Sequence, residues 1–384
     1  MNNSLFENQI PFMKPWLGEE EWSCLKDIIT SGWVSQGPKV AEFESEVAKY
    51  LGAKHAIATN ACTSAMHLSL KIAGVKYGDE VIVCDSTCMA NVNAIIMAGA
   101  IPVFVDADDK TFNLDIQLIE NKISEKTKAI MNIDQIGLPN DIDSIQDIAN
   151  KHGIFLLDDA ATAFGAEYKN KKLGSGNIVT TFSFHPRKMI TTGEGGMLVT
   201  NDDNIAEQAR ILRSAGASVS DLERHKAKGA IIQKYYDNGY NYRMTDVQAA
   251  IGLVQMKKIN AIITQRTEQA IYYNNRFEGN EKIQTPFVPS YAKHAWSSYC
   301  IQITPISKKR VPEIIDEMIH NNIAVRFGIQ PLHREPFFEN KKFSDDSFPV
   351  SCDIAENAIF LPIYPGLTSV EQEYIADTLL RIIK

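Results

Sequence analysis

The stretch Ser183-Phe184-His185-Pro186-Arg187-Lys188-Met189-Ile190-Thr191-Thr192-Gly193-Glu194-Gly195-Gly196-Met197 decides the fold and the chemistry expected of this chain. It indicates the end of a strand, a tight polar turn that carries Lys188, and a glycine-rich return into a second strand. A lysine amine forms Schiff bases with carbonyl compounds only when it is partly deprotonated, as burial or a neighbouring cation such as Arg187 would make it. Alone, the turn is weak evidence, because most lysines beside loops are solvated surface charges.

An apolar segment upstream, Ile154-Phe155-Leu156-Leu157-Asp158-Asp159-Ala160-Ala161, ends in two carboxylates. It predicts a buried strand that carries Asp159 at its C-terminal end, where open α/β sheets bind their ligands. Chemistry with pyridoxal 5'-phosphate (PLP) needs an acidic partner for the pyridine nitrogen and a lysine that forms a Schiff base. Asp159 followed by Lys188 therefore favours a PLP site.

Short apolar segments alternate with helical patterns along the first half of the chain. Strands are predicted at 55–59, 81–84, 101–105 and 128–133, with helices between them. Strands that alternate with helices imply a mainly parallel sheet with both faces covered. The expected fold class is α/β.

Three motifs, in this order along nearly the whole chain, resemble the DegT/DnrJ/EryC1/StrS family of PLP-dependent nucleotide-sugar aminotransferases. They are Asp159-Ala160-Ala161, the block from Ser183 to Gly196, and Gly239-Tyr240-Asn241-Tyr242-Arg243-Met244. The resemblance implies an aspartate-aminotransferase-like fold of type I. We expect a large PLP-binding domain at 1–256, which includes an N-terminal helical segment, and a smaller α+β domain at 257–384.

A helix start after Asn60 is the expected phosphate site. Free backbone N–H groups and the positive end of the helix dipole bind anions. Thr63 and Ser64 stand at this start, where side chains commonly act only as N-caps. The resemblance places both on the PLP phosphate together with Ser183, and adds Asn241 from a second subunit. Asn241 alone would be interpreted as a turn residue; the resemblance implies a homodimer with shared active sites.

Three predicted pocket positions depart from the family pattern. Cys88 replaces an aromatic residue that stacks on the cofactor ring, and its sulfur cannot stack in the same way. Asp134 replaces a histidine close to the cofactor, where an acid could accept a hydrogen bond from the PLP hydroxyl. Thr162 stands where relatives often carry Gln or His. Together they indicate a subgroup with its own substrate preference.

Four residues are candidates for substrate contacts, each with a structural alternative. Trp33 lies in a loop that the family places near the sugar, but it would equally pack two helices together. Arg326 and His333 resemble the family's arginine strand and Pro-Leu-His turn, and a guanidinium binds carboxylates and phosphates bidentately. An interdomain salt bridge is an equal alternative for Arg326. His185 is expected to orient its turn rather than to act as an acid or base.

The resemblance implies a reaction. Lys188 would hold PLP as a Schiff base and shuttle a proton, and Asp159 would keep the pyridine nitrogen protonated. The substrate would be a nucleotide-linked 4-keto-6-deoxy sugar for a surface polysaccharide such as an O-antigen, and glutamate the probable amino donor.

Three other functions stay open. A sugar dehydratase of the same family would carry histidine in place of Lys188. A PLP enzyme with a non-sugar product, such as an aminohydroxybenzoate synthase, fits the same motifs. A non-catalytic regulator that binds PLP or a nucleotide sugar would not need Lys188 and Asp159 together.

Composition restricts the partners and the compartment. The formal charge of -8 and the absence of a long basic run argue against nucleic acid as the main partner. Six cysteines without metal-type spacing indicate reduced thiols, with no disulfide and no zinc. No apolar run approaches the roughly 18 residues of a membrane span. The expected location is the cytoplasm.

Overall fold

A seven-stranded sheet forms the centre of the protein in a computed structural model that describes residues 8–217, 232–341 and 343–384. The strand order is β1-β9-β8-β5-β4-β2-β3. Four of the six neighbouring pairs are parallel, and only the pairs that involve β9 are antiparallel. The strands are β1 (His55–Thr59), β2 (Glu80–Cys84), β3 (Ile101–Val105), β4 (Thr127–Ile133), β5 (Phe155–Asp159), β8 (Val179–Ser183) and β9 (Gly196–Thr200).

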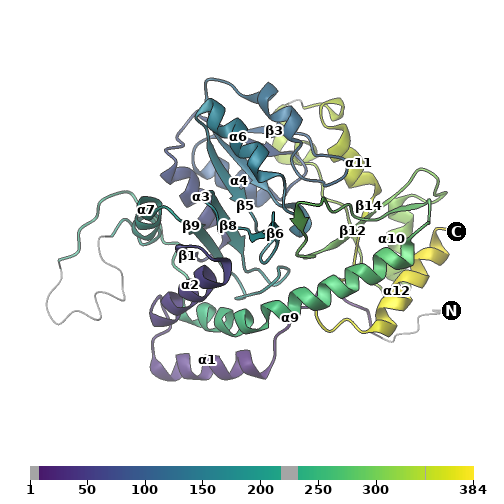
Figure 1. Ribbon diagram of the computed structural model, residues 1–384, viewed down its shortest axis with the longest axis horizontal. Helices are drawn as coiled ribbons and strands as arrows, with labels where there is room; N and C mark the ends of the chain where they lie inside the picture. The colour runs from purple at the N-terminus through teal and green to yellow at the C-terminus, as the bar shows by residue number, and fades with distance from the viewer. Residues whose placement is uncertain (1–7, 218–231, 342) are drawn as a thin grey trace.

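Helices cover both faces of this sheet (Figure 1). On the face of Asp159, its carboxylate meets side chains from two helices, α3 and α4. On the opposite face, the neighbouring Asp158 lies beside α6. Successive side chains of a strand point to opposite faces, so these two aspartates mark the two sides of the sheet. The helices of this region are α2 (Pro38–Leu51), α3 (Cys62–Ile72), α4 (Met89–Met97), α5 (Ile116–Ile119), α6 (Ile142–His152) and α7 (Asp203–Arg213).

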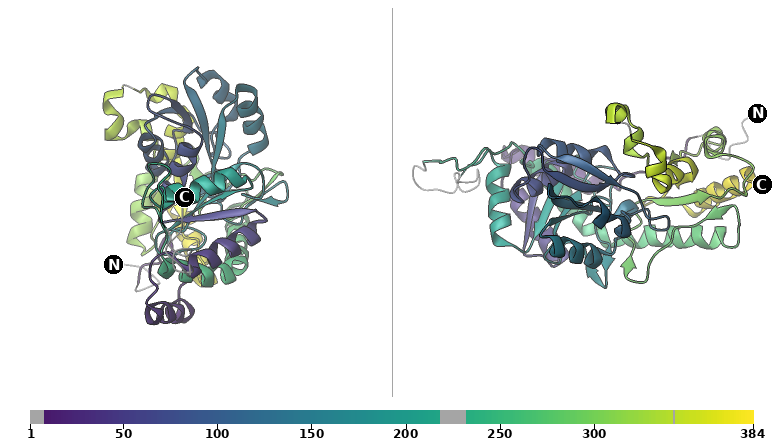
Figure 2. Two further views of the ribbon diagram at one scale, coloured as in Figure 1. Left: turned by 90° about the vertical axis from the view of Figure 1, so that its left-hand side faces the viewer. Right: turned by 90° about the horizontal axis from the view of Figure 1, so that it is seen from above.

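A second, antiparallel sheet lies toward the C-terminus, with strand order β10-β12-β14-β13. Viewed from above, its strands and helices lie at one end of the elongated molecule and the seven-stranded sheet at the other (Figure 2). Its elements are β10 (Ile283–Gln284), β12 (Tyr299–Ile303), α10 (Val311–His320), β13 (Arg326–Phe327), α11 (Pro349–Asn357), β14 (Ala358–Leu361) and α12 (Ser369–Ile382). The expected fold, a mainly parallel sheet plus a smaller α+β part, is confirmed.

Helix α9 (Asp246–Phe277) joins the two parts (Figure 1). It begins against α1 (Glu19–Ser31) and α2 and ends beside α12. Its first residue, Asp246, accepts hydrogen bonds from Gly37 N (2.8 Å) and Val40 N (3.0 Å), so its carboxylate caps the start of α2. Buried residues form one core around the large sheet and a second around the small one.

The predicted boundary between residues 256 and 257 falls inside α9, which is continuous there. Ile10, near the start of the chain, is buried in the second core and bridges Ile323. A small sheet also joins β11 (Ala292–Lys293) to β6 (Glu167–Tyr168) and β7 (Lys171–Lys172). The boundary stays a prediction.

Short 3-10 helices fill several connections: η1 (Glu120–Lys122), η2 (Gln135–Gly137), η3 (Leu332–Arg334), η4 (Pro336–Lys341) and η5 (Asp345–Ser347). All six cysteines are free thiols. Across residues 8–217, 232–341 and 343–384, no helix combines the length and the apolar character that a membrane crossing needs.

Candidate active site

The turn between β8 and β9 holds Lys188 in a half-buried position. The turn is closed by main-chain bonds: Lys188 N donates to His185 O at 2.8 Å, and Phe184 O accepts from Thr192 N at 3.0 Å. Because β8 and β9 pair directly on either side, both ends of the turn are anchored in the sheet. Lys188 is therefore presented at a fixed place on the sheet edge.

Asp159 ends β5, one strand away from the lysine turn, and is 3% exposed. Its carboxylate accepts from Asn91 Nδ2 at 2.5 Å and Ala161 N at 3.0 Å. Burial raises the pKa of Asp159, while the hydrogen bond from Asn91 and the charge of Lys188 lower it. The acid and the lysine thus share one electrostatic environment, as PLP chemistry requires.

The thiol of Cys62 lies in the same environment, at the start of α3. Its Sγ is 3.7 Å from Asp159 Oδ1. Burial and the Asp159 charge raise the pKa of this thiol well above its usual value, and Lys188 lowers it. Cys62 is consequently a neutral neighbour of the Asp159 carboxylate.

At the start of α3, Ser64 N donates to Ala61 O at 3.1 Å, while Cys62 N and Thr63 N have no acceptor among the described residues. The N-cap position is Ala61, and no side chain caps the helix, so Thr63 and Ser64 are not its N-caps. Ser64 Oγ donates to Asn60 Oδ1 at 2.7 Å. Strand β9 approaches so closely that a Cβ at Gly196 would lie 2.4 Å from Cys62 N. A helix start brought this close to the lysine turn fits a phosphate group.

The segment that carries Asn241 is held by aromatic contacts. The Tyr240 and Tyr242 rings stack at 5.0 Å, and Tyr242 Oη lies 3.1 Å from His67 Nδ1. The Asn241 carbonyl accepts from Asn60 Nδ2 at 3.4 Å. The Asn241 side chain is exposed, and its amide has no hydrogen-bond partner within the described part of the chain.

The three departures from the family pattern lie at different places. Cys88 is exposed at the N-cap position of α4. Thr162 Oγ1 donates to the main-chain oxygen of Asp134 at 2.7 Å. The carboxyl of Asp134 accepts from Asn140 N at 2.9 Å and lies with Asp158, on the opposite side of the sheet from Asp159. The expected contact of Asp134 with the cofactor hydroxyl is not favoured by this arrangement.

Ser183 and His185 flank the lysine turn. Ser183 Oγ accepts from His185 N at 3.4 Å, and His185 Nδ1 accepts from Arg187 N at 3.2 Å. His185 Nε2 lies 3.9 Å from Glu194 Oε1. These bonds suit the orienting role expected of His185, because its ring joins the two sides of the turn.

Trp33 and Arg326 lie apart from this group. Trp33 Nε1 donates to Gln36 O at 3.2 Å, and the indole ring covers Gly37. Arg326 is exposed on β13, with its guanidinium 5.8 Å above the Phe12 ring. In the regions that the structure describes, Arg326 forms no salt bridge, so the interdomain ion pair is not observed.

His333 joins the C-terminal part to the large sheet. Its Nδ1 lies 2.6 Å from Asp85 Oδ2, just after β2, and its Nε2 lies 2.9 Å from Asp345 Oδ1. Cys352 Sγ is 4.0 Å from Nε2, so His333, Asp345 and Cys352 form a group with metal-ligand chemistry. Asp345 is also paired with Arg334, and these ion pairs satisfy the group without an ion. Both ring nitrogens are engaged, which leaves His333 no free atom for a substrate.

Sequence reasoning missed Asn91 and Asn132. Asn91 is the closest polar partner of Asp159, but it lies in a largely apolar helix. Asn132 lies inside a buried strand and bonds Asp134 and Asp158. A polar residue in an otherwise apolar buried element was the available signal, because buried amides require partners.

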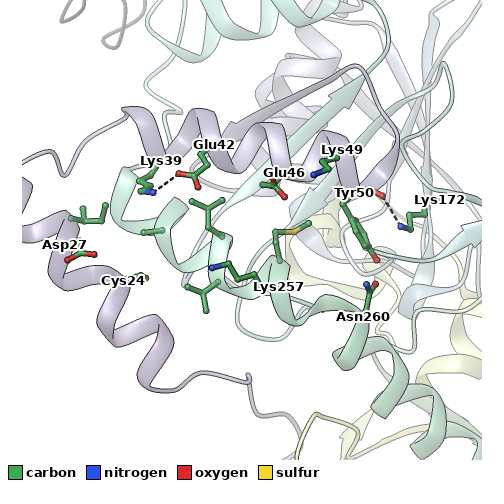
Figure 3. A pocket seen from close by; sticks show the side chains of 15 residues that line it. Cys24, Asp27, Lys39, Glu42, Glu46, Lys49, Tyr50, Lys172, Lys257 and Asn260 are labelled. Atoms are coloured by element: carbon green, nitrogen blue, oxygen red, sulfur yellow. Dashed lines mark hydrogen bonds and ion pairs between the residues drawn. The ribbon is translucent and has the colours of Figure 1, made fainter.

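Several pockets of the described residues contain neither Lys188 nor Asp159. One of about 720 Å³ lies between α1, α2 and α9, lined by residues such as Cys24, Lys39 and Lys257 (Figure 3). None of the predicted site residues lines it.

Comparison with known proteins identifies the relatives of this chain. The DegT/DnrJ/EryC1/StrS aminotransferase family model matches residues 15–380. The spore coat polysaccharide biosynthesis protein SpsC of Bacillus subtilis is 35% identical, covering 98% of this chain and 97% of its own. GDP-perosamine synthase of Caulobacter vibrioides is 34% identical, covering 98% of both chains.

A solved structure shares the fold. Spr1654 from Streptococcus pneumoniae in its PMP-form superimposes with a TM-score of 0.91 at 28% identity, covering 97% of this chain and 98% of its own. The same protein has been solved in its PLP-form. With the match over nearly the whole chain, this protein belongs to the DegT/DnrJ/EryC1/StrS aminotransferase family, whose members are PLP-dependent sugar transaminases.

Proposed function

We propose that this chain transfers an amino group from glutamate to a nucleotide-linked 4-keto-6-deoxy sugar. The observation that carries the proposal is the shared environment of Lys188 and Asp159 beside the start of α3. A non-catalytic binder would need neither the lysine nor the buried acid, and a dehydratase would not carry the lysine.

The residues present fit PLP. The phosphate would lie at the start of α3, held by Thr63, Ser64 and Ser183, where Gly196 leaves room. When bound, PLP supplies an electron sink that stabilises negative charge on the substrate carbon. The Asp159 carboxylate would lie on the pyridine nitrogen, and Asn91 keeps its Oδ2 oriented.

Lys188 would do two things in turn. Its Nζ atom would hold the cofactor at rest, and once free it would act as the base and acid that moves a proton at the substrate carbon. Such a side chain must reach both the cofactor and the substrate carbon. The turn meets this need, because its main chain is fixed while the side chain is half-buried and unpaired by any side-chain hydrogen bond in the described residues.

A second chain would complete the site. The exposed Asn241 amide would reach the partner's phosphate, and its lack of a partner among the described residues supports this arrangement. Helix α1 adds an apolar surface: Trp22 is 70% exposed and Ile29 is 64% exposed. Large exposed apolar side chains of this kind are typical of interfaces between subunits.

The relatives support the substrate class. One is a GDP-perosamine synthase, and another belongs to spore coat polysaccharide biosynthesis. A nucleotide sugar made in the cytoplasm for a surface polysaccharide would agree with both. Cys88, Asp134 and Thr162 differ from the family pattern, so the sugar itself is to be identified by a screen of nucleotide-linked keto sugars.

Absorbance spectra of the holoenzyme test the proposal. Wild type should show the visible absorbance band of bound PLP. Glutamate should replace this band with the spectrum of pyridoxamine 5'-phosphate (PMP), because the amino group passes to the cofactor. Lys188→Ala should lose the lysine-bound band and reduce turnover by about 10³-fold or more. Lys128→Ala, at an exposed lysine of β4 outside the site, is the control and should keep both the band and its conversion.

Two results would count against the proposal. If glutamate leaves the wild-type band unchanged, glutamate is excluded as the amino donor. Other amino acids are then tested as donors in the same assay. A converted band with no turnover on any nucleotide-linked keto sugar removes the sugar assignment and favours a non-sugar product.

A further inference from the structure

Two buried carboxyl groups lie behind Asp159, on the other face of the sheet. Asp134 is 1% exposed and Asp158 is 2% exposed. One amide serves both, because Asn132 Nδ2 donates to Asp158 Oδ1 at 2.8 Å and to Asp134 Oδ1 at 3.2 Å. The two carboxyls therefore share a single small site.

The hydrogen-bond donors around Asp134 and Asp158 are too few to stabilise two ionised carboxylates. Asn140 N donates to Asp134 Oδ1 at 2.9 Å, and Thr180 Oγ1 lies 3.5 Å from Asp158 Oδ2. Asp134 Oδ2 is buried and has no hydrogen-bond partner. In a carboxylate this atom would be a desolvated charge without a donor, and a proton on it removes the problem.

Basic side chains near the site are held elsewhere. Lys169 Nζ pairs with Asp143 of α6 at 2.6 Å, and Lys172 Nζ donates to Tyr50 O at 3.0 Å. Lys171 is exposed. Within the described residues, neither Asp134 nor Asp158 forms a salt bridge. Other titratable groups near the pair in the described residues are acidic or phenolic: Asp141, Asp143 and Asp159, and Tyr291, whose pKa is raised by burial first and then by the charges of Asp141, Asp108 and Asp134.

Two like charges in one buried site cannot both ionise at neutral pH. Burial raises the pKa of Asp134 well above its usual range, and the charge of Asp158 raises it further. Burial also raises the pKa of Asp158; the Asn132 bond lowers it, and the Asp159 charge raises it. One proton must remain on the pair.

We propose that Asp134 and Asp158 share this proton in a hydrogen bond between their carboxyl groups, and that the pair is a positioning group for Asp159. The contacts between them are direct. Asp134 N donates to Asp159 O at 3.0 Å, and Asp158 precedes Asp159 on β5. The shared proton limits the pair to one negative charge, and the hydrogen bond it makes fixes the ends of β4 and β5 beside the pyridine-binding acid. This second role rests on the proposed function.

The proton has a route to water that avoids the active site. Asp158 and Thr180 line a pocket of about 540 Å³ beside α6, on the face away from Asp159. Lys169, Lys171 and Lys172 lie at the same pocket. Proton exchange of the pair therefore occurs without opening the cofactor side.

Infrared spectra of the holoenzyme, recorded in H2O and in D2O and subtracted, test the shared proton. Wild type at neutral pH should show the C=O stretch of a protonated, buried carboxyl, which shifts in D2O. Asp134→Asn and Asp158→Asn should each lose this band, because the new amide N–H donates a hydrogen bond to the remaining acid in place of the shared proton and that acid ionises. Asp143→Asn, at the same pocket but paired with Lys169, should keep it.

Two outcomes would overturn the shared proton: no such band in wild type, or a band that both variants keep. The wild-type spectrum needs no variant and no activity, so it decides the point even if the proposed function fails or a variant does not fold. The positioning role needs a second readout. In both variants, the pH at which kcat falls on the acid side of its profile should differ by half a pH unit or more from that of Asp143→Asn. An unchanged value would contradict the positioning role.

Discussion

The closest polar partner of Asp159 is an amide from a different element. Asn91 of α4 donates to Asp159 Oδ2, and this bond opposes the effect of burial on the Asp159 pKa. A hydrogen bond to a charged group contributes about 1.5–3 kcal/mol. Asn91 is itself buried and is held by Thr87 Oγ1 at 3.3 Å. The ionised form of Asp159 therefore depends first on this donor, with smaller contributions from Lys188, Ala161 N and the Cys62 thiol.

Replacing Asn91 should change the pH dependence of the reaction. In Asn91→Leu the bond that favours the ionised acid is gone, so the pKa of Asp159 rises. The proposed reaction needs the ionised carboxylate of Asp159. The pH of half-maximal activity on the acid side should therefore be about one to two units higher than in wild type. The kcat pH profile measures this change.

Asn93→Leu is the matched control, because Asn93 is exposed on the same helix. Its profile should coincide with wild type. If the two variants give the same acid limb, Asn91 does not set the ionisation of Asp159.

At the scale of elements, the site depends on the contact between β9 and the start of α3. Gly196 begins β9, and a side chain there would meet Cys62 N at 2.4 Å and the Ala61 carbonyl carbon at 2.5 Å. Both neighbours are main chain, so neither can move aside without moving the helix. The glycine allows the helix start to reach the lysine turn.

Gly196→Ala should therefore displace the start of α3. Overpacking of this kind costs about 1–3 kcal/mol in the free energy of unfolding. The displaced N–H groups should also weaken PLP binding by about tenfold, which corresponds to ~1.4 kcal/mol. Urea unfolding and an absorbance titration with PLP measure the two effects. Gly176→Ala, where a Cβ would meet nothing within 4 Å, should change neither; equal affinities in the two variants would exclude this role of Gly196.

The sequence predicts some of these elements and not others, for a physical reason. The period of apolar residues predicts the strands and helices of the large sheet, and the polar residue that ends β5 predicts the acid. Contacts between distant segments leave no local signal. The Asp246 carboxylate caps α2 from more than 200 residues away, at Gly37 and Val40.

The direction of a side chain at a strand end is equally hard to predict. Asp134 occupies the motif position of a residue close to the cofactor, so the sequence predicts that its side chain faces the cofactor. In the structure Asn132 of β4 pairs with Asp158 of β5, and Asp134, two residues later, lies on their face of the sheet. Register decides the face of every strand residue, and it depends on how the two strands pair rather than on the sequence of either one.

At the scale of the whole molecule, the proposed dimer would complete each site with a residue of the other chain. Lys188 and Asp159 lie inside the fold, while the Asn241 amide is exposed and directed at no group of its own chain among the described residues. If Asn241 acts on the phosphate of a partner subunit, each active site of the proposed dimer takes Lys188 from one chain and Asn241 from the other. Two inactive variants should then complement each other.

The variants are Lys188→Ala and Asn241→Asp; the second places a negative charge against the phosphate and should weaken PLP binding. Each should be inactive alone at limiting PLP. After unfolding and refolding together in equal amounts, about half of the dimers are mixed, and each mixed dimer has one intact site, so about a quarter of the wild-type activity should return. Light scattering measures the dimer, and turnover measures the recovery. Mixing without refolding should recover nothing at first, and refolding that also recovers nothing would place Asn241 in the site of its own chain or outside the site.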